Sequence, residues 1–520
     1  MHKPIGAIAA GHPEPARAAE LILHDGGNAF DAAVSAQLTA FVAEPVLTSP
    51  GGGGFLLAEK KGGEQTVYDF FVQTPLKKRE ASRIQFTPIM ADFGEARQEF
   101  HIGAGTVATP GMVKGLFAIQ RDLCTMPMTR LAEYAIGLAK NGVRVNGFQS
   151  HIFDIVEPIY TSSDDTRQIF GSRREEGRPA REGEILKMPH LASFLSELSA
   201  DGPGFFYEGE IARKIENICT SMGGHLTRDD LKEYRVFRRS PLQFMYRDSR
   251  VSVNPPPSSG GILIAFALKL MEQLQQGGLR FGSEEHLSLL STIQEMTHKA
   301  KLDAFVNSPY DDPAERLLDP GFLADYKREV AGRLASFRGT TQISIIDRHG
   351  NMASLTSSNG EGCGVMIPGT GVMLNNMLGE EDLNPDGFHA WQTGQRMTSM
   401  MAPAILKLPD GTRAALGSGG SNRIRTAMMQ VLMNMAGFGM TPADAVSSPR
   451  IHCEDGRLNM EAFFGNDNIE ELAANYPSHK LWKEKNLFFG GVHAAALGPN
   501  GYSGAGDERR GGVSIVVRGE

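Results

Sequence analysis

The apolar residues of this chain follow one period in its first part and another in its last part. Between about residues 111 and 300, they recur at spacings of three and four, which is the period of one face of an α-helix. After Thr340 the pattern changes to strand-like segments, interrupted by one helical stretch, "RIRTAMMQVLMNMAGF". Helices and strands segregated in this way favour an antiparallel sheet core with helices packed outside. The sequence therefore predicts an α+β layered fold.

The N-terminal region adds helices and strands to this picture. The segment "ARAAELILHD" is a predicted helix that stops at two glycines. The almost wholly apolar "NAFDAAVSAQLTAFVAEP" predicts a buried helix capped by Asn28 that ends before Pro45. Two short strands are predicted next, in "SPGGGGFLLAEK" after its glycine turn and in "TVYDFFV".

Glycine and proline are distributed evenly, which bears on domain organisation. The 60 glycines and 28 prolines of the 520 residues are spread throughout, so no linker marks a boundary. We therefore expect one large, loop-rich domain, although a chain of this length could hold two or more.

Charge and cysteine content exclude several classes of partner. The formal net charge is -8, so no basic field would attract a nucleic acid or an anionic membrane. The four cysteines show no CxxC spacing, which argues against a zinc site and a disulfide scaffold. No stretch is apolar enough over about 20 residues to predict a transmembrane helix. The first twenty residues lack the pattern of a secretory signal, so a cytoplasmic location is expected.

A β-hairpin is predicted just after residue 340. A three-residue loop, Arg348 to Gly350, would pair Asp347 with Asn351, and Gly350 suits the left-handed position of such loops. This register places Thr340 opposite Ser358. One face of the hairpin is then polar and the other apolar, with these members: Thr340, Gln342, Ser344, Ser354, Thr356 and Ser358 on the first; Ile343, Ile345, Ala353 and Leu355 on the second. The polar face could simply be solvated.

The Gly339–Thr340 junction offers a functional alternative. A threonine hydroxyl is a poor nucleophile unless a nearby group accepts its proton. A free α-amine on the same residue, with a pKa of about 7.7 to 8.0, can do so. Cleavage between Gly339 and Thr340 would create that amine, and Gly339 leaves the junction sterically open.

A second segment could supply donors for an oxyanion. "LGSGGSNRIRT", residues 416 to 426, predicts a strand that ends in glycines and leads into a helix. The free N–H groups of such a helix start can stabilise a developing negative charge. An ordinary strand-to-helix turn explains the same pattern.

These two segments resemble the γ-glutamyltranspeptidase family of N-terminal-nucleophile hydrolases. Further similarity follows in order along nearly the whole chain, in these segments: "GGNAFDAAVSAQLTAFVAEPVLTSPGGGGFLL", "NPPPSSGGI" at 254–262, "PGTGVMLNN" at 368–376, "PRIH" at 449–452 and "GDERRGG" at 506–512. The resemblance implies a four-layer αββα sandwich. It also implies a precursor that cuts itself into a large segment, 1–339, and a small segment, 340–520, which together form one interleaved domain.

The same resemblance implies roles for particular residues. Thr340 corresponds to the nucleophile, and Ser358 to a second hydroxyl residue that steadies it. The oxyanion donors fall on the backbone amides of Gly420 and Ser421. The implied reaction is attack by Thr340 on a γ-glutamyl amide, followed by transfer of the acyl group to water or an amine. No metal and no organic cofactor is implied.

The substrate-binding residues of the family correspond less well. The arginine that binds the substrate carboxylate aligns with Glu80, which leaves the adjacent Arg79 as the candidate. Glu380 aligns best with the acidic group that holds the substrate ammonium, among Glu380, Glu381 and Asp382. The family's twin serines correspond to Thr398 and Ser399, and the residue after the two threonines is Gln342 where the family has histidine.

Three functions remain open at this point. The first is a γ-glutamyl transferase or glutathione hydrolase with small-molecule substrates. The second is a related amidase for another acyl group, such as glutaryl or poly-γ-glutamate. The third is a binding protein that kept the fold and lost the activity. The two segments of the precursor are the expected protein partners, and a homodimer is compatible with the sequence.

Overall fold

Two antiparallel β-sheets form the centre of the molecule. The computed structural model describes residues 3–92, 97–274, 278–301, 317–318, 339–384, 387–462, 464, 472–473 and 475–519. The seven-stranded sheet has the following order: β22 (Val513–Arg518), β1 (Pro4–Ala10), β11 (Thr341–Asp347), β12 (Met352–Ser358), β2 (Gly53–Glu59), β3 (Gln65–Phe70), β8 (Phe237–Arg239). The six-stranded sheet has this order: β21 (Gly501–Ala505), β20 (Gly491–Gly498), β16 (Arg413–Gly419), β15 (Ala404–Lys407), β10 (Ser249–Val253), β9 (Leu242–Tyr246).

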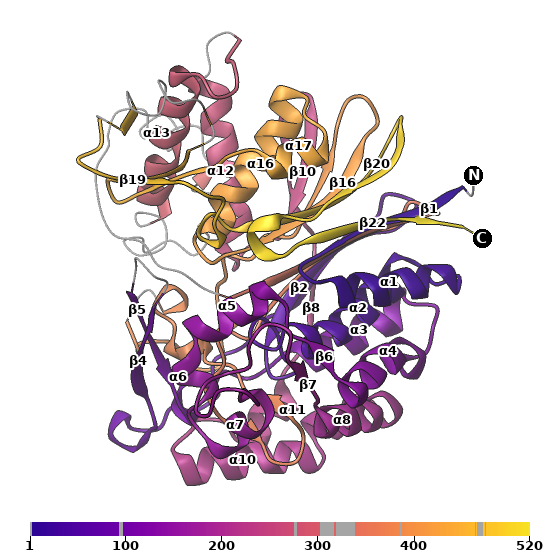
Figure 1. Cartoon of the computed structure of the whole chain (residues 1–520), viewed down its shortest axis with the longest axis vertical. Helices are drawn as coiled ribbons and strands as arrows, with labels where there is room; N and C mark the ends of the chain where they lie inside the picture. Colours follow the sequence, from indigo (N-terminus) through magenta and orange to yellow (C-terminus); the bar gives the residue numbers. More distant parts are fainter. Residues whose placement is uncertain are drawn as a thin grey trace.

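Both sheets combine strands from before and after position 339. The N-terminal strand β1 lies between β22 and β11, and β10 pairs with β15. Figure 1 shows β1 and β22 side by side, with the two chain ends close together. The residues before and after position 339 therefore build each sheet together. The position of the cut itself stays a prediction.

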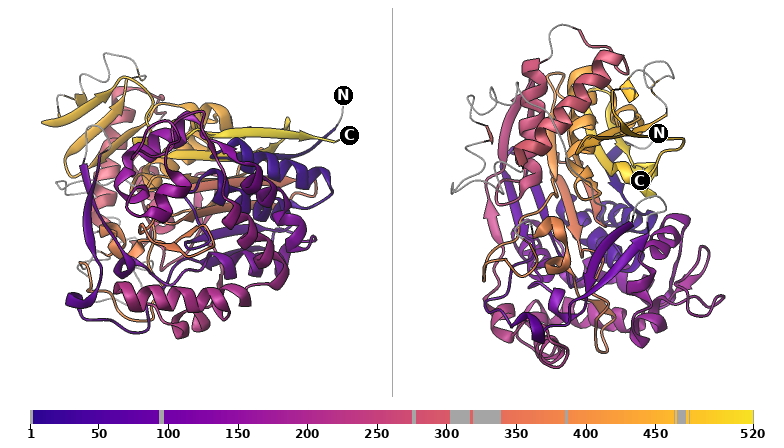
Figure 2. Two further views of the ribbon diagram at one scale, coloured as in Figure 1. Left: turned by 60° about the horizontal axis from the view of Figure 1, so that its bottom comes forward. Right: turned by 90° about the vertical axis from the view of Figure 1, so that its left-hand side faces the viewer.

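Helices cover the outer face of each sheet. The seven-stranded sheet packs against α1 (Pro13–His24) and α2 (Ala29–Ala43), with α3 (Met112–Leu123), α4 (Met128–Asn141) and α8 (Pro189–Asp201) in the same apolar core. The six-stranded sheet packs against α12 (Ser259–Leu274) and α16 (Arg423–Phe438), with α13 (Glu284–Lys301) beside α12. Figures 1 and 2 show these helices on opposite sides of the strands. The predicted four-layer αββα sandwich is confirmed.

Smaller elements surround this sandwich. Within the described residues, the other α-helices are α5 (Gly147–Ile155), α6 (Glu157–Tyr160), α7 (Asp164–Phe170), α9 (Gly204–Tyr207), α10 (Glu210–Met222), α11 (Arg228–Glu233) and α17 (Pro442–Ser447). The remaining strands are β4 (Thr87–Asp92), β5 (Arg97–Ile102), β6 (Val143–Arg144), β7 (Ile185–Leu186), β13 (Met366–Ile367), β14 (Val372–Met373), β17 (Ile451–Glu454), β18 (Arg457–Glu461) and β19 (Ser478–Trp482).

The predicted start and burial of α2 are confirmed. The Asn28 side chain accepts hydrogen bonds from the N–H groups of Phe30 and Asp31, and the Asp31 carboxylate accepts one from the N–H of Asn28. This reciprocal cap satisfies donors that a helix start leaves open. Every residue of α2 is buried, as its apolar sequence indicates.

The predicted register of the β11–β12 hairpin is also confirmed. Gln342 pairs with Thr356, Ser344 with Ser354, and the turn residue Gly350 has a φ of 81°. The apolar face contacts the helices of the first layer. The polar face is not solvated, because it packs against β16 and β20 of the other sheet.

The Gln342 side chain provides hydrogen-bond partners for several hydroxyl groups of this buried polar layer. Its Nε2 donates to the hydroxyls of Ser344 at 2.9 Å and Ser354 at 3.1 Å, and its Oε1 accepts from Thr356 at 2.5 Å. Gly417 in β16 makes room for it, since a Cβ there would lie 2.2 Å from Oε1 of Gln342. Buried polar groups joined in this way are costly to disturb, so the layer fixes how the two sheets meet.

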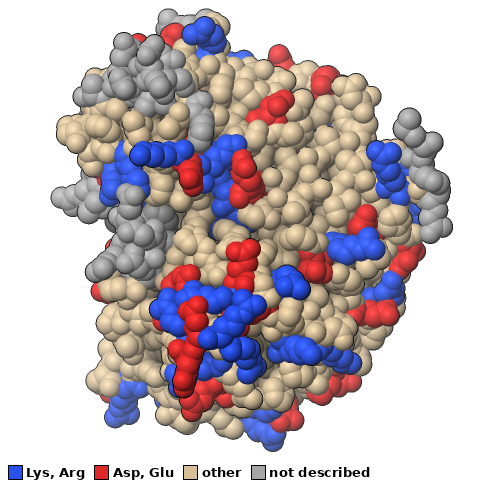
Figure 3. Space-filling view, viewed as in Figure 1, with Lys and Arg blue, Asp and Glu red and all other residues tan. Residues whose placement is uncertain are grey.

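Charged residues of both signs are interspersed on the face shown in Figure 3, most densely over its lower half. No helix within the described residues has the length and apolar character needed to cross a membrane.

Candidate active site

Two hydroxyl groups contact the carbonyl oxygen of Gly339. Oγ1 of Thr340 donates to it at 2.7 Å and Oγ of Ser358 donates at 2.8 Å. Ser358 ends β12, and Thr340 directly precedes β11 on the paired strand. The Ser358 hydroxyl also accepts from the N–H of Gly360 at 3.0 Å, which fixes its orientation. The hairpin register therefore brings both hydroxyls to one peptide group.

The N–H of Gly339 is held as well. It donates to Oε1 of Glu361 at 2.6 Å. A Cβ at position 339 would lie 2.7 Å from Oε2 of the same carboxylate, so a larger residue would require the Glu361 side chain to shift. Glu361 is 2% exposed, and its own N–H donates to Oδ1 of Asn376 at 2.9 Å.

Glu44 contacts Thr341, the first residue of β11. It caps the C-terminus of α2, is fully buried, and its Oε1 accepts from Oγ1 of Thr341 at 2.9 Å. Burial raises the pKa of Glu44 to about 7, and the Thr341 hydrogen bond opposes this shift only in part. A carboxyl group that is about half protonated near pH 7 thus lies next to the junction residues.

The raised pKa of Glu44 predicts a pH-dependent stability. The folded chain favours the neutral carboxyl group, so its contribution is fully present below the unfolded value of 4.5 and is lost as pH rises through about 7. At about 1.4 kcal/mol per pKa unit, the loss is on the order of 3 kcal/mol. Glu44→Gln keeps an acceptor for Thr341 and cannot ionise. We expect the melting temperature of the variant to rise relative to that of the wild type as pH increases from 5 to 8. A difference in melting temperature that stays constant over this range would contradict the prediction.

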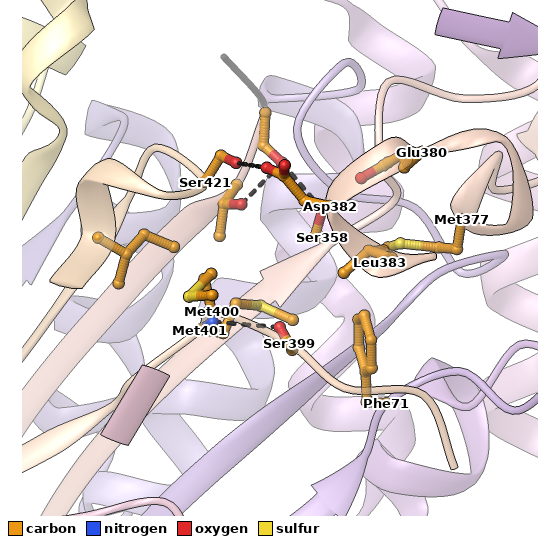
Figure 4. Close-up of a pocket in the computed structure, with 13 residues that line it drawn as sticks. Phe71, Ser358, Met377, Glu380, Asp382, Leu383, Ser399, Met400, Met401 and Ser421 are labelled. Atoms are coloured by element: carbon orange, nitrogen blue, oxygen red, sulfur yellow. Dashed lines mark hydrogen bonds between the residues drawn. The ribbon is translucent and has the colours of Figure 1, made fainter. Parts of the chain in front are cut away.

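A pocket opens at the Gly339–Thr340 junction (Figure 4). Its apolar lining consists of Phe71, Met377, Leu383, Met400, Met401 and Ile424. Its polar lining consists of Gly339, Thr340, Ser358, Glu380, Asp382, Ser399 and Ser421. No lysine or arginine lines this pocket within the described part of the chain.

The turn between β16 and α16 forms one wall of this pocket. Gly420 and Ser421 have φ angles of 128° and 54°, and a Cβ at Gly419 would lie 2.2 Å from the carbonyl oxygen of Thr340. The Ser421 hydroxyl donates to Oδ2 of Asp382 at 2.8 Å, and Figure 4 shows the two side chains pointing toward one another. The turn therefore lies close to Thr340 and directly precedes α16. The first N–H groups of a helix have no partner within the helix, so they can bind a ligand.

The structure brings most of the predicted site residues together. Thr340, Ser358, Glu380, Ser399 and Ser421 line one pocket with Gly339, and Gly420 precedes Ser421 in its wall. The roles assigned to them stay predictions.

Besides Gly420, two of the predicted residues are not among those that line the pocket. Arg79 is half-buried, and its N–H donates to Nδ1 of His225 at 3.1 Å. Thr398 is half-buried next to Ser399. Their proposed part in substrate binding stays a prediction without support from this geometry.

Three carboxyl groups at the site were not singled out by sequence reasoning. Asp382 belongs to the acidic run from which Glu380 was preferred, so the run itself was the signal. Glu361 follows Ser358 by three residues in a glycine-rich turn, which gives no hint that it binds Gly339. Glu44 was assigned only to the end of a helix.

Among the described residues, no group of three or more His, Cys, Asp or Glu could hold a metal ion.

The αββα sandwich, with Thr340 at the start of a central strand, is the architecture of N-terminal-nucleophile hydrolases. A sequence model of the γ-glutamyltranspeptidase family matches residues 16–517. The chain belongs to this family.

Individual relatives agree with that assignment. The glutathione hydrolase proenzyme of Escherichia coli (strain K12) is 29% identical, and the alignment covers 94% of this chain and 87% of that protein. The acylase ACY 1 proenzyme of Pseudomonas sp. (strain V22) is also 29% identical, with 99% and 94% covered. The crystal structure of a cephalosporin acylase from Bacillus halodurans superposes with a TM-score of 0.86 at 24% identity over 100% and 97% of the two chains, which supports the fold.

Proposed function

We propose that this protein is a self-processing γ-glutamyl transferase or hydrolase that uses Thr340 as its nucleophile. The observation that carries the proposal is the pair of hydroxyls, from Thr340 and Ser358, on the Gly339 carbonyl oxygen at the mouth of the pocket. Relatives named glutathione hydrolase proenzyme support both the activity and a precursor that is cut into two segments.

The first reaction is cleavage of the chain itself. Oγ1 of Thr340 attacks the carbonyl carbon of Gly339, and the C–N bond of the junction breaks as the hydroxyl proton passes to the amide nitrogen. Gly339 is then held as an ester on Thr340, and the α-amine of Thr340 is free. Water hydrolyses the ester, leaving a carboxylate on Gly339 and the hydroxyl on Thr340.

The second reaction uses the new amine. It accepts the proton of the Thr340 hydroxyl as Oγ1 attacks the γ-carbonyl carbon of the donor. The backbone N–H groups of Gly420 and Ser421 stabilise the oxyanion, and Ser358 steadies the nucleophile. The donor's amine leaves with the proton, and water or an acceptor amine then takes the acyl group. The two carboxylates Glu380 and Asp382 suit the ammonium of a γ-glutamyl donor.

A related acylase activity is the second candidate. It is favoured by the apolar part of the pocket lining, which suits an acyl group without the α-ammonium. Relatives named acylase ACY 1 proenzyme support it. An inactive binding homologue remains the third alternative.

Matched chromogenic donors test the proposal. Purified protein is assayed with γ-glutamyl anilide and glutaryl anilide, which differ only in the α-amino group, while intact mass is followed in parallel. We expect two segments, with Thr340 as a new N-terminus, and turnover of the γ-glutamyl anilide. Turnover of the glutaryl anilide alone would establish the acylase, and a single uncut chain without turnover would establish the binding homologue.

Two further proposals rest on sequence alone. We propose a cytoplasmic location, with a small-molecule γ-glutamyl donor and an amine acceptor or water as reaction partners, and we propose that the protein can form a homodimer.

A further inference from the structure

We propose that Glu361 is a positioning residue for self-cleavage, and that its carboxylate holds the Gly339 peptide for attack by Thr340 and restricts position 339 to glycine. The inference rests on the proposed self-cleavage. It assigns a function to a residue outside the pocket-lining set described above.

Glu361 completes the binding of the residue that is to be cut. The carbonyl oxygen of Gly339 accepts from Thr340 and Ser358, and its N–H donates to Oε1 of Glu361 at 2.6 Å. Glycine has the widest backbone freedom of any residue, so a glycine junction held only at its oxygen could rotate. Fixing both ends of Gly339 limits that rotation and keeps its carbonyl carbon beside the attacking hydroxyl, which is the positional contribution to catalysis.

The turn that carries Glu361 is itself rigidly placed. It follows β12 directly, and Gly360 and Gly362 on either side have φ angles of 65° and 86°. The N–H of Gly360 binds the Ser358 hydroxyl and the N–H of Glu361 binds Asn376. The same turn therefore orients both Ser358 and Glu361 on the two ends of one residue.

The second carboxylate oxygen explains the glycine. A Cβ at position 339 would lie 2.7 Å from Oε2 of Glu361 and 3.2 Å from the carbonyl oxygen of Gly360. Real Cβ atoms essentially never come as close as 2.7 Å, so a larger residue would shift the Glu361 carboxylate and weaken its hydrogen bond to the N–H of Gly339. Glycine at the junction and glutamate at 361 are thus coupled.

A buried cation, Arg510, lies near Glu361. A separate cavity on this side of the junction is lined by Gly339, Glu361, Arg510 and apolar residues that include Leu47 and Phe148. Burial lowers the pKa of Arg510 to about 10, and the nearby Glu361 carboxylate opposes that shift. Arg510 is therefore still a cation at neutral pH, and an ionised carboxylate accepts a stronger hydrogen bond than a neutral group does.

The test measures how fast newly made chains are cut. Wild type and variants are synthesised in a cell-free system with a short label pulse, and conversion of full-length chain into the 340–520 segment is followed over time. Glu361→Ala is expected to slow cleavage by about 10-fold to 100-fold, the range for a hydrogen bond to a charged group. Glu361→Gln keeps an acceptor of the same shape and is expected to cut within about 5-fold of wild type. Glu64→Gln, a change at an exposed carboxylate, is the matched control and is expected to cut at the wild-type rate.

The coupling to glycine gives a readout that a merely structural role would not produce. Gly339→Ala should slow cleavage in the wild-type background and add little once Glu361→Ala has removed the clash. Multiplicative slowing in the double variant, equal rates for Glu361→Gln and Glu361→Ala, or cleavage of Glu361→Ala within 2-fold of wild type would each overturn this inference alone. A wild type that stays uncut would overturn the proposed function and the inference together.

Discussion

Thr340→Ala is expected to remain one chain of full-length mass and to lose acyl transfer by at least about 10³-fold, because the same oxygen atom performs both reactions. In the uncut chain this hydroxyl lies 2.7 Å from the carbonyl oxygen of the bond to be broken, so it is already beside its target. Removing it leaves Ser358 on that oxygen, but Ser358 has no free α-amine and does not follow the junction bond in the chain. Intact mass after prolonged incubation and turnover of the γ-glutamyl anilide measure the two effects.

Thr340→Ser separates the hydroxyl from the rest of the side chain. Serine keeps the attacking oxygen, so this variant is expected to cut itself and to retain measurable turnover, although more slowly because its χ1 is less restricted than that of threonine. If Thr340→Ala were cut between residues 339 and 340, or if it turned over donor at a rate close to wild type, the assignment of the nucleophile would be wrong.

The hairpin that carries this threonine could be predicted because its register is a local property. A three-residue loop with Gly350 in the left-handed conformation determines which residues of β11 and β12 face each other, and the observed pairs follow that arithmetic. The cap and burial of α2 were predictable for the same reason, since Asn28, Asp31 and the apolar run lie within one segment. Local turn and cap chemistry thus predicted the part of the site that the hairpin builds.

The environment of the polar face could not be predicted in the same way. Whether Gln342 faces water or another sheet depends on β16 and β20, which lie about 70 and 150 residues further along. The contacts of Glu361 and Glu44 have the same origin, because each carboxylate meets a segment that only the tertiary fold brings to it. Arg79 is the converse case: sequence position suggested a substrate contact, the path of its loop places its backbone N–H on His225, and its part in substrate binding stays a prediction.

Asp507→Ala is expected to give the largest loss of stability of any single change considered for this chain, about 3–5 kcal/mol, because it removes the anion from a buried charge cluster. Oδ2 of Asp507 accepts from Arg450 at 2.6 Å, and Oδ1 accepts from Nη1 of Arg509 at 3.1 Å. Burial alone would raise the pKa of Asp507, but Arg450 and Arg509 lower it to about 2. Its contribution is therefore fully present above the unfolded value of 3.8 and is lost as pH falls through about 2.

Loss of this charge cluster should also disturb the active site, because Arg450 holds backbone groups that contact it. Arg450 also donates to the carbonyl oxygens of Phe489 and Gly490, and Gly490 packs against Gly420 in the predicted oxyanion turn. Denaturant midpoints, measured in a Thr340→Ala background so that every variant is one chain, give the effect. Glu508→Ala is the matched control, because this neighbouring carboxylate is 67% exposed and its ion pair with Lys485 is worth at most about 1 kcal/mol. Two results would show that the cluster does not depend on this carboxylate. One is equal denaturant midpoints for the two variants at pH 7. The other is a stability loss of Asp507→Ala, relative to the Thr340→Ala chain, that does not become smaller between pH 4 and pH 2.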